Sequence, residues 1–287
     1  MLHNSEKDFI KRHIGPSEDD QSKMLKKLNY KSLDDLINST VPEKIQFKGE
    51  LNIGESNSEY EALRKLKAIS KKNQIYSNFI GMGYYGTYTP YVILRNILEN
   101  PGWYTSYTPY QPEVAQGRLE MLLNFQQMIV DFTGMDIANA SLLDEGTAAA
   151  EAMGLSYRLD KSDSNLVFVS ENCHPQTIEV IRTRAEPMGL KVLVGNEDKV
   201  LEQLKEDIVC GILQYPGTLG DIKDPSEAIS KIHKKNGKAI LACDLLALAK
   251  LKTPRELGAD IAVGSSQRFG IPMGLWRTTC SIFCNKR

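Results

Sequence analysis

The sequence has 287 residues, of which 25% are charged and 41% hydrophobic, and 35 Lys and Arg against 36 Asp and Glu leave a formal net charge of -1. A near-neutral balance without a long basic run gives no electrostatic footprint for nucleic acid. No apolar stretch approaches the roughly 20 residues of a membrane-spanning helix. We therefore expect a soluble globular protein that binds neither nucleic acid nor membrane.

The amino-terminal residues and the cysteines bear on the compartment. The first ten residues, MLHNSEKDFI, lack the basic start and apolar stretch of a secretory signal and contain acidic residues that transit peptides avoid. The five cysteines form no C-x-x-C pair, and an odd number in a chain this long does not suggest a disulfide framework. We expect a cytoplasmic protein with free thiols, and the histidines are too scattered to propose a metal site.

Residues 1–70 are polar with helical periodicity, and they predict a small helical arm. Ser17 is followed three residues later by Asp20, and the same spacing recurs at Ser32 and Asp35. These pairs resemble capping boxes, with Asp where Glu or Gln is usual, so a helix is predicted to begin after each serine.

Residues 78–111 are rich in Gly, Pro and Tyr and hold most of the twelve tyrosines. The repeated Gly and Pro predict ordered loops around a short helix at 91–99. The tyrosines could line a site or an interface, or they could simply pack the loops onto the core, since aromatic side chains serve both purposes. A long amphipathic helix is predicted at 112–132.

The remainder, within a large domain predicted at 71–274, alternates short apolar runs with helical stretches. Strands that alternate with helices are typical of βαβ units, so we expect an α/β fold with a mostly parallel sheet and helices on both faces. Gly189 and Gly237 are predicted to end two of the helices. The predicted strands are 166–170, 191–195, 208–215, 238–244 and 260–266.

A literal G-x-G-x-x-G occurs at Gly81, Gly83 and Gly86. The dinucleotide-binding fingerprint needs a strand before it and a helix opening inside it. Here Thr87–Pro90 follows instead of a helix. A glycine-rich turn is favoured, and an NAD-binding domain stays as the weaker interpretation.

The turn at 139–147 precedes an alanine-rich helix, and its Ser, Gly and Thr could form an anion-binding helix N-terminus. Asp144 and Glu145 place negative charge where a phosphate would lie. These carboxylates favour self-capping of the helix over phosphate binding.

Two polar residues follow or end predicted strands. His174 comes after the strand at 166–170, and Asp244 ends the strand at 238–244. Open α/β sheets bind ligands at the carboxyl ends of their strands. Each residue alone is more often structural, but together they indicate a candidate site.

Four segments carry a resemblance to a known family: RHIGPSEDD, NFIGMGYYGT, the stretch from ILENPGWYTSYTPYQPEVAQGRLEM to SLLDEGTAAAEAM, and GSSQRFGIPMG. Over residues 8–274 the chain resembles the amino-terminal half of the glycine cleavage system P protein, glycine dehydrogenase (decarboxylating), an oxidoreductase acting on a CH–NH2 group. The resemblance implies an aspartate aminotransferase-like fold of the pyridoxal-phosphate-dependent transferases. It also implies glycine as substrate, pyridoxal 5'-phosphate as cofactor, and transfer of the aminomethyl group to the lipoyl group of H protein.

The resemblance further implies that the cofactor lysine lies in a carboxy-terminal half or subunit outside this chain. Gln267 takes the position of that lysine, and an amide cannot form an aldimine. The neighbouring Arg268 stays protonated and is no nucleophile. His174 and Asp244 match positions where the functional half stacks a histidine on the pyridine ring and sets an aspartate against its nitrogen. These are degenerate cofactor positions, so we expect no catalytic residue in this chain, no covalently bound cofactor and no activity of the chain alone.

The implied role is a supporting one. The chain would pair with the carboxy-terminal half and contribute to the substrate channel or to the mouth where the lipoyl arm enters. Tyr107, Tyr110, Gln111 and Glu113 are the candidate contributors. The alternative is a non-catalytic interaction module that binds H protein or the catalytic half.

Residues 275–287 depart from the family pattern, which continues with a run close to Y-G-G-P-H-A-A-F-F-A. One permitted set of codons for Leu275–Arg287, read from its second base, gives Y-G-G-P-H-A-A-F-F-A-I-K. We therefore expect a frame-shifted tail, in which Cys280 and Cys284 carry no metal or redox role.

Overall fold

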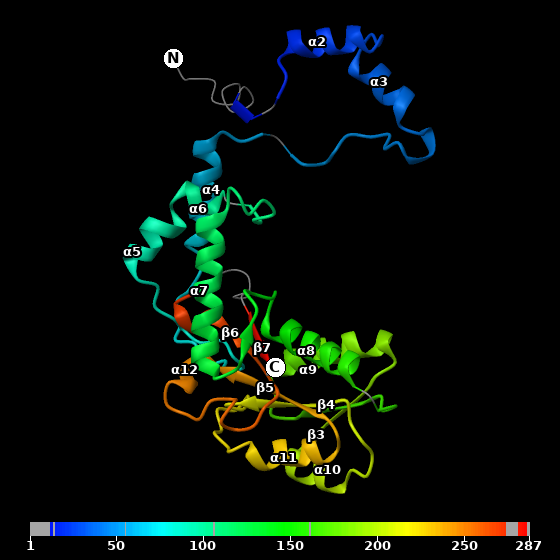
Figure 1. Ribbon diagram of the computed structural model, residues 1–287. Coiled ribbons are helices and arrows are strands. Elements are labelled where there is room, and N and C mark those ends of the chain that lie inside the picture. Colours follow the sequence, from blue (N-terminus) through cyan, green and yellow to red (C-terminus); the bar gives the residue numbers. More distant parts are fainter. Residues whose placement is uncertain are drawn as a thin grey trace. The chain divides into compact units, whose positions relative to one another are not determined.

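The computed structural model describes residues 12–13, 15–54, 56–105, 107–160, 162–273 and 281–285 (Figure 1). The chain divides into two compact units, Met1–Ser77 and Asn78–Arg287. The predicted boundary after residue 70 coincides with the end of a helix, whereas the units divide after Ser77. None of the helices in the described ranges is long and apolar enough to cross a membrane.

The first unit contains helices that bury none of their own residues. Ser17 and Asp20 form a complete capping box at the start of the first of them, and the Ser32 hydroxyl accepts a hydrogen bond from the Asp35 N–H at the next. Both predicted helix starts are thus confirmed. The helices are α2 (Glu18–Lys27), α3 (Leu33–Thr40), the 3-10 turn η1 (Glu43–Ile45) and α4 (Glu59–Ser70).

The second unit begins with irregular chain that carries short helices, as the glycines and prolines predict. A short helical segment at 91–98 is present in place of the predicted 91–99. The long helix begins at Gln116 and not at Pro112, because the N–H groups of Val114 and Ala115 bond back to Gln111 and Pro112 in tight turns. The elements are α5 (Tyr91–Ile93), the π-helical η2 (Leu94–Leu98), α6 (Pro101–Tyr104) and α7 (Gln116–Thr133).

A seven-stranded sheet in the order β1-β7-β6-β5-β4-β2-β3 forms the centre of the second unit. Strands β2 to β6 are parallel, whereas β7 runs antiparallel between β6 and β1. The expected mostly parallel sheet is confirmed, and all five predicted strands are present. The strands are β1 (Ile137–Ala138), β2 (Leu166–Ser170), β3 (Lys191–Gly195), β4 (Cys210–Tyr215), β5 (Lys238–Asp244), β6 (Ile261–Ser265) and β7 (Ser281–Asn285).

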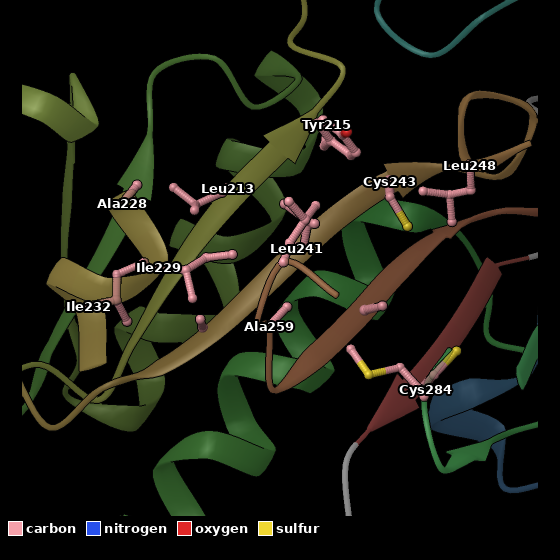
Figure 2. Packing of buried hydrophobic residues seen from close by; sticks show 14 of the residues in the cluster. Leu213, Tyr215, Ala228, Ile229, Ile232, Leu241, Cys243, Leu248, Ala259 and Cys284 are labelled. Atoms are coloured by element: carbon pink, nitrogen blue, oxygen red, sulfur yellow. The ribbon is translucent and has the colours of Figure 1, made fainter. Parts of the chain in front are cut away.

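Helices cover both faces of the sheet, and alternate strand residues supply two apolar cores. Leu241 and Cys243 of β5 face the core formed with α7, α10, α11 and α12 (Figure 2). Ile240 and Ala242 face the core formed with α8 and α9. The helices are α8 (Glu145–Leu159), α9 (Pro175–Ala185) with the 3-10 turn η3 (Glu186–Met188), α10 (Glu197–Gln203), α11 (Ser226–Lys234), α12 (Leu245–Leu248) and the 3-10 turn η4 (Ser266–Phe269).

The two predicted helix-ending glycines differ in outcome. Gly189 ends η3 in the left-handed conformation, with φ +71°. At the end of α11 the left-handed residue is Asn236, with φ 58°, and not Gly237. A Cβ on Gly237 would lie 2.6 Å from Cγ1 of Ile208, so this glycine is required by close packing.

The tail and the cysteines are described only in part. Residues 274–280 and 286–287, including Cys280, lie outside the described residues. Ser281–Asn285 forms β7, in which Cys284 is fully buried. Cys173, Cys210, Cys243 and Cys284 are free thiols, as expected. The origin of the tail in a shifted frame stays a prediction.

Candidate functional site

Three polar residues converge where the parallel strands end. His174 is the N-cap of α9 after β2, Asp244 is the last residue of β5, and Gln267 lies in the turn after β6. Together with Tyr85 and Glu145 they line one small cavity. Its volume is about 20 Å³, which is room for about one water molecule. The carboxyl edge of the sheet thus carries a cleft that the protein's own side chains fill.

Arg268 is the residue that fills most of the charged part of this cleft. Its Nη2 donates to Oδ2 of Asp244 at 2.8 Å, and its Nε lies 3.1 Å from both carboxylate oxygens. The guanidinium also lies over the ring of Tyr85, 3.7 Å from the ring centroid. Both charged side chains are largely withdrawn from solvent, where a forked, stacked pair is at its strongest. The negative charge of Asp244 is therefore compensated by Arg268 of the same chain.

Gln267 is 2% exposed, and its amide is used as a backbone anchor. Nε2 donates to the carbonyl oxygen of Tyr85 at 2.9 Å, across 182 residues of sequence. An amide has no nucleophilic lone pair comparable to that of an amine, so this position offers no covalent chemistry.

The surroundings of Glu145 and His174 shift the pKa of each group towards its neutral form. Burial raises the pKa of Glu145 to about 7, with a further increase from Asp244 and Asp144 and an opposing hydrogen bond from Gln214. Burial lowers the pKa of His174 to about 4, although Asp244 acts in the opposite direction. Glu145 Oε1 lies 3.8 Å from His174 Nε2, beyond hydrogen-bond distance. The contact is consequently no ion pair at neutral pH.

The amino terminus of α8 caps itself. The carboxylate of Asp144 accepts a hydrogen bond of 2.7 Å from the Thr147 N–H, as an N-cap aspartate does. The self-capping favoured by the sequence is confirmed, and the terminus has a carboxylate where an anion would bind.

The G-x-G-x-x-G segment is a turn. Gly81 and Gly83 have φ of +69° and +81°, and the Tyr84 N–H bonds back to the Gly81 carbonyl. The next helix begins only at Tyr91. No helix opens within residues 81–86, as the dinucleotide-binding fingerprint requires, and Gly83 packs instead against the side chain of His174, the N-cap of α9. The NAD-binding interpretation is therefore not supported.

The candidate channel residues lie in a different place, on the surface. Tyr107, Tyr110 and Gln111 line an open hollow of about 710 Å³ together with Arg118, which donates to the Tyr107 carbonyl. The two tyrosines are 79% and 76% exposed, so they do not pack the loop onto the core. Glu113 lies outside this hollow and faces another with Pro112 and Gln116.

Comparisons with known proteins identify the family. The sequence model of the family "Glycine cleavage system P-protein" matches residues 11–286. The chain belongs to this family. It is 79% identical over 286 residues to the glycine dehydrogenase (decarboxylating) of Pelagibacter ubique, covering 100% of this chain and 30% of that protein. It is 55% identical over 278 residues to the enzyme of the same name from Nostoc punctiforme, covering 97% of this chain and 28% of that protein.

Solved structures agree with the P-protein assignment. A crystal structure of glycine decarboxylase (P-protein) in an inhibitor-bound form superposes with a TM-score of 0.86 at 30% identity, over 96% of this chain and 63% of that one. The sphingosine-1-phosphate lyase of Burkholderia pseudomallei shares the fold, with a TM-score of 0.64 at 12% identity, over 85% of this chain and 62% of that one. The expected pyridoxal-phosphate-dependent transferase-like fold is confirmed. The chain spans about 30% of the length of its curated relatives.

The cleft does not fit the cofactor that this family implies. Small-molecule sites typically enclose about 300–1,000 Å³, whereas the two cavities lined by His174 and Glu145 have volumes of about 20 Å³ and 60 Å³. Gln267 is a buried amide bonded to the Tyr85 carbonyl, and Asp244 is paired with Arg268. No step of a pyridoxal-phosphate reaction can therefore be assigned to residues of this cleft.

Sequence reasoning missed three features of the cleft, namely the ring of Tyr85, the ion pair of Arg268 with Asp244, and the largely buried carboxyl group of Glu145. The sequence alone identifies Arg268 only as a residue that cannot act as a nucleophile. A usable signal existed, because the arginine follows one parallel strand and the aspartate ends the neighbouring one, so their side chains meet at the same edge.

Proposed function

We propose that this chain is the non-catalytic, amino-terminal part of a glycine dehydrogenase (decarboxylating). In the complete enzyme, a lysine-bearing carboxy-terminal half or subunit decarboxylates glycine with pyridoxal 5'-phosphate and transfers the aminomethyl group to the lipoyl group of H protein. The observation that carries the proposal is Gln267, buried and bonded to the Tyr85 carbonyl in the position that resembles the cofactor lysine. The chain alone is inactive, because Gln267 provides no amine in the cleft and the cleft has no space for the cofactor.

The exposed aromatic surface of the second unit supports pairing with the rest of the enzyme. Large apolar side chains of α5, η2, α6 and the following loop are exposed, and such concentrations mark interaction sites. They include Tyr91, Val92, Leu98, Tyr104, Tyr107, Tyr110 and Val114. Tyr107, Tyr110, Gln111 and Glu113 are proposed to contribute to the substrate channel or to the mouth that admits the lipoyl arm.

Reconstitution tests this proposal. The chain is mixed with the complementary part of the Pelagibacter ubique relative, and exchange of labelled bicarbonate into glycine is measured with pyridoxal phosphate and lipoylated H protein. We expect no exchange from either polypeptide alone and exchange from the mixture. Exchange catalysed by the 287-residue chain alone would overturn the proposal.

The alternative, an interaction module without a place in the enzyme, predicts a different result. Such a module would bind H protein or the complementary part, yet the mixture would show no exchange. The exposed hollow at Tyr107, Tyr110 and Gln111 is compatible with it. Alanine variants at these three positions that lose H-protein binding, in a mixture that never shows exchange, would favour the module.

A further inference from the structure

The tyrosine loop, residues 81–90, closes over the cleft and is held there by contacts from distant parts of the chain. Its Tyr85 carbonyl accepts from Gln267, and the Thr87 hydroxyl donates to the Ile271 carbonyl at 2.6 Å. The Thr89 hydroxyl donates to the carbonyl of Gly270. The segment after β6, residues 267–271, is therefore hydrogen-bonded to the loop at Tyr85, Thr87 and Thr89.

Arg268 joins this loop to the sheet. One face of its guanidinium covers the Tyr85 ring, while its edge donates to Asp244 at the end of β5. The carboxylate is itself fixed, because Asp244 Oδ1 accepts from the Leu246 N–H as the N-cap of α12. A single side chain thus ties a loop without regular structure to a buried strand and a helix start.

We propose that Asp244, Gln267 and Arg268 form a latch that holds the tyrosine loop in place, so that the degenerate cleft acts as a positioning device. The loop leads directly into α5 and the exposed aromatic surface. A loop fixed before association loses less conformational entropy on binding, which strengthens pairing without any new contact. The latch residues are positioning residues, and their effect on pairing rests on the proposed function.

The chemistry of the latch requires arginine. A lysine ammonium carries the same charge but can neither form the planar fork to both oxygens of Asp244 nor stack flat on Tyr85. Arg268→Lys should consequently behave much more like Arg268→Ala than like the wild type.

Amide hydrogen exchange of the full 287-residue chain tests the latch. We expect Arg268→Ala and Arg268→Lys to lower protection in peptides spanning 81–90 by roughly tenfold or more, with the strands β4 and β5 unchanged. Arg184→Ala, which removes an exposed arginine paired with Glu151, is the matched control and should change nothing there. Asp244→Asn, which keeps the size of the side chain, gives the same test if Arg268→Ala fails to fold.

Pairing with the complementary part is then measured for the same variants. We expect the Kd to rise roughly tenfold for Arg268→Ala and Arg268→Lys and to stay unchanged for Arg184→Ala. Unchanged protection at 81–90, or full restoration by lysine, would overturn the latch. A loosened loop with an unchanged Kd would overturn its positioning role. Failure of the wild-type chain to pair at all would instead count against the proposed function and leave the exchange result standing.

Discussion

Glu145 and His174 have largely buried side chains whose pKa values shift in opposite directions. The pKa of Glu145 rises from 4.5 to about 7, so its protonated form favours the folded state below pH 4.5 and that stability is lost as the pH rises through about 7. The pKa of His174 falls from 6.5 to about 4, so its contribution is present above pH 6.5 and is lost as the pH falls through about 4. Each shift corresponds to about 3 kcal/mol, and the two offset each other between pH 4.5 and 6.5.

Glu145→Gln should remove the contribution of Glu145 to the pH dependence of stability and leave that of His174. The variant keeps an amide beside Gln214 but loses the acid, so its free energy of unfolding should rise by about 3 kcal/mol from pH 4 to 6.5 and stay level to pH 8. The wild type should show a flatter rise and then a decline towards pH 8. Urea unfolding at pH 4.5, 6.5 and 8 measures both profiles. Parallel profiles would contradict the assignment, and Glu151→Gln, at an exposed position, should follow the wild type.

Restoring the missing amine should not restore the cofactor site. In Gln267→Lys the new side chain would enter a cavity of about 20 Å³ next to the Arg268 guanidinium. After incubation with pyridoxal phosphate and borohydride reduction, peptide mapping should find no more adduct at position 267 than at exposed lysines. A dominant adduct at position 267 would show that the cleft still admits the cofactor.

The elements differ in how well the sequence predicts them, and the reason is the range of the interactions that form them. The bounds of β2, β3 and β5 follow from local apolar runs and agree with the predicted ranges. The antiparallel pairing of β7 with β1 joins Ile137 to Asn285, which are far apart in sequence, and no local pattern predicts it. α10 has only seven residues, too few for a periodic signal.

The site follows the same rule. That His174 and Asp244 face one edge is predictable, because parallel strands end together. The ion pair of Asp244 with Arg268 is formed by tertiary contact between β5 and the turn after β6. The hydrogen bond from Gln267 to the Tyr85 carbonyl spans 182 residues, so only the folded chain reveals that the cleft is closed.

Within the tyrosine loop, two glycines provide a matched test of how closely this element packs. Gly83 has φ +81°, and a Cβ there would lie 3.0 Å from Nε2 of His174. Gly83→Ala should lower the free energy of unfolding by about 1–2 kcal/mol from the left-handed backbone alone. Gly86 has no such backbone conformation and no atom within 4 Å of an added Cβ, so Gly86→Ala should stay within about 0.5 kcal/mol of the wild type. Equal effects of the two substitutions in urea unfolding would contradict the left-handed conformation of Gly83.

At the scale of the whole molecule, the two units differ in how many of their apolar side chains are buried. The sheet of the second unit buries two apolar cores, whereas α2, α3 and α4 of the first unit bury none of their own residues. The second unit also exposes the aromatic surface of α5, η2 and α6. Exposed apolar area of this kind favours association, with a partner or with other copies of the chain.

The chain alone should therefore be marginally stable or prone to aggregate. We expect differential scanning calorimetry of the 287-residue chain to show no cooperative unfolding transition above about 60 °C, a temperature near the upper end of the midpoints usual for mesophilic domains. Adding the complementary part of the Pelagibacter ubique relative should raise the midpoint in a concentration-dependent manner, because a partner that binds only the folded state stabilises it by mass action. A reversible transition well above 60 °C for the chain alone, unaffected by the partner, would mean that the exposed aromatic surface needs no cover.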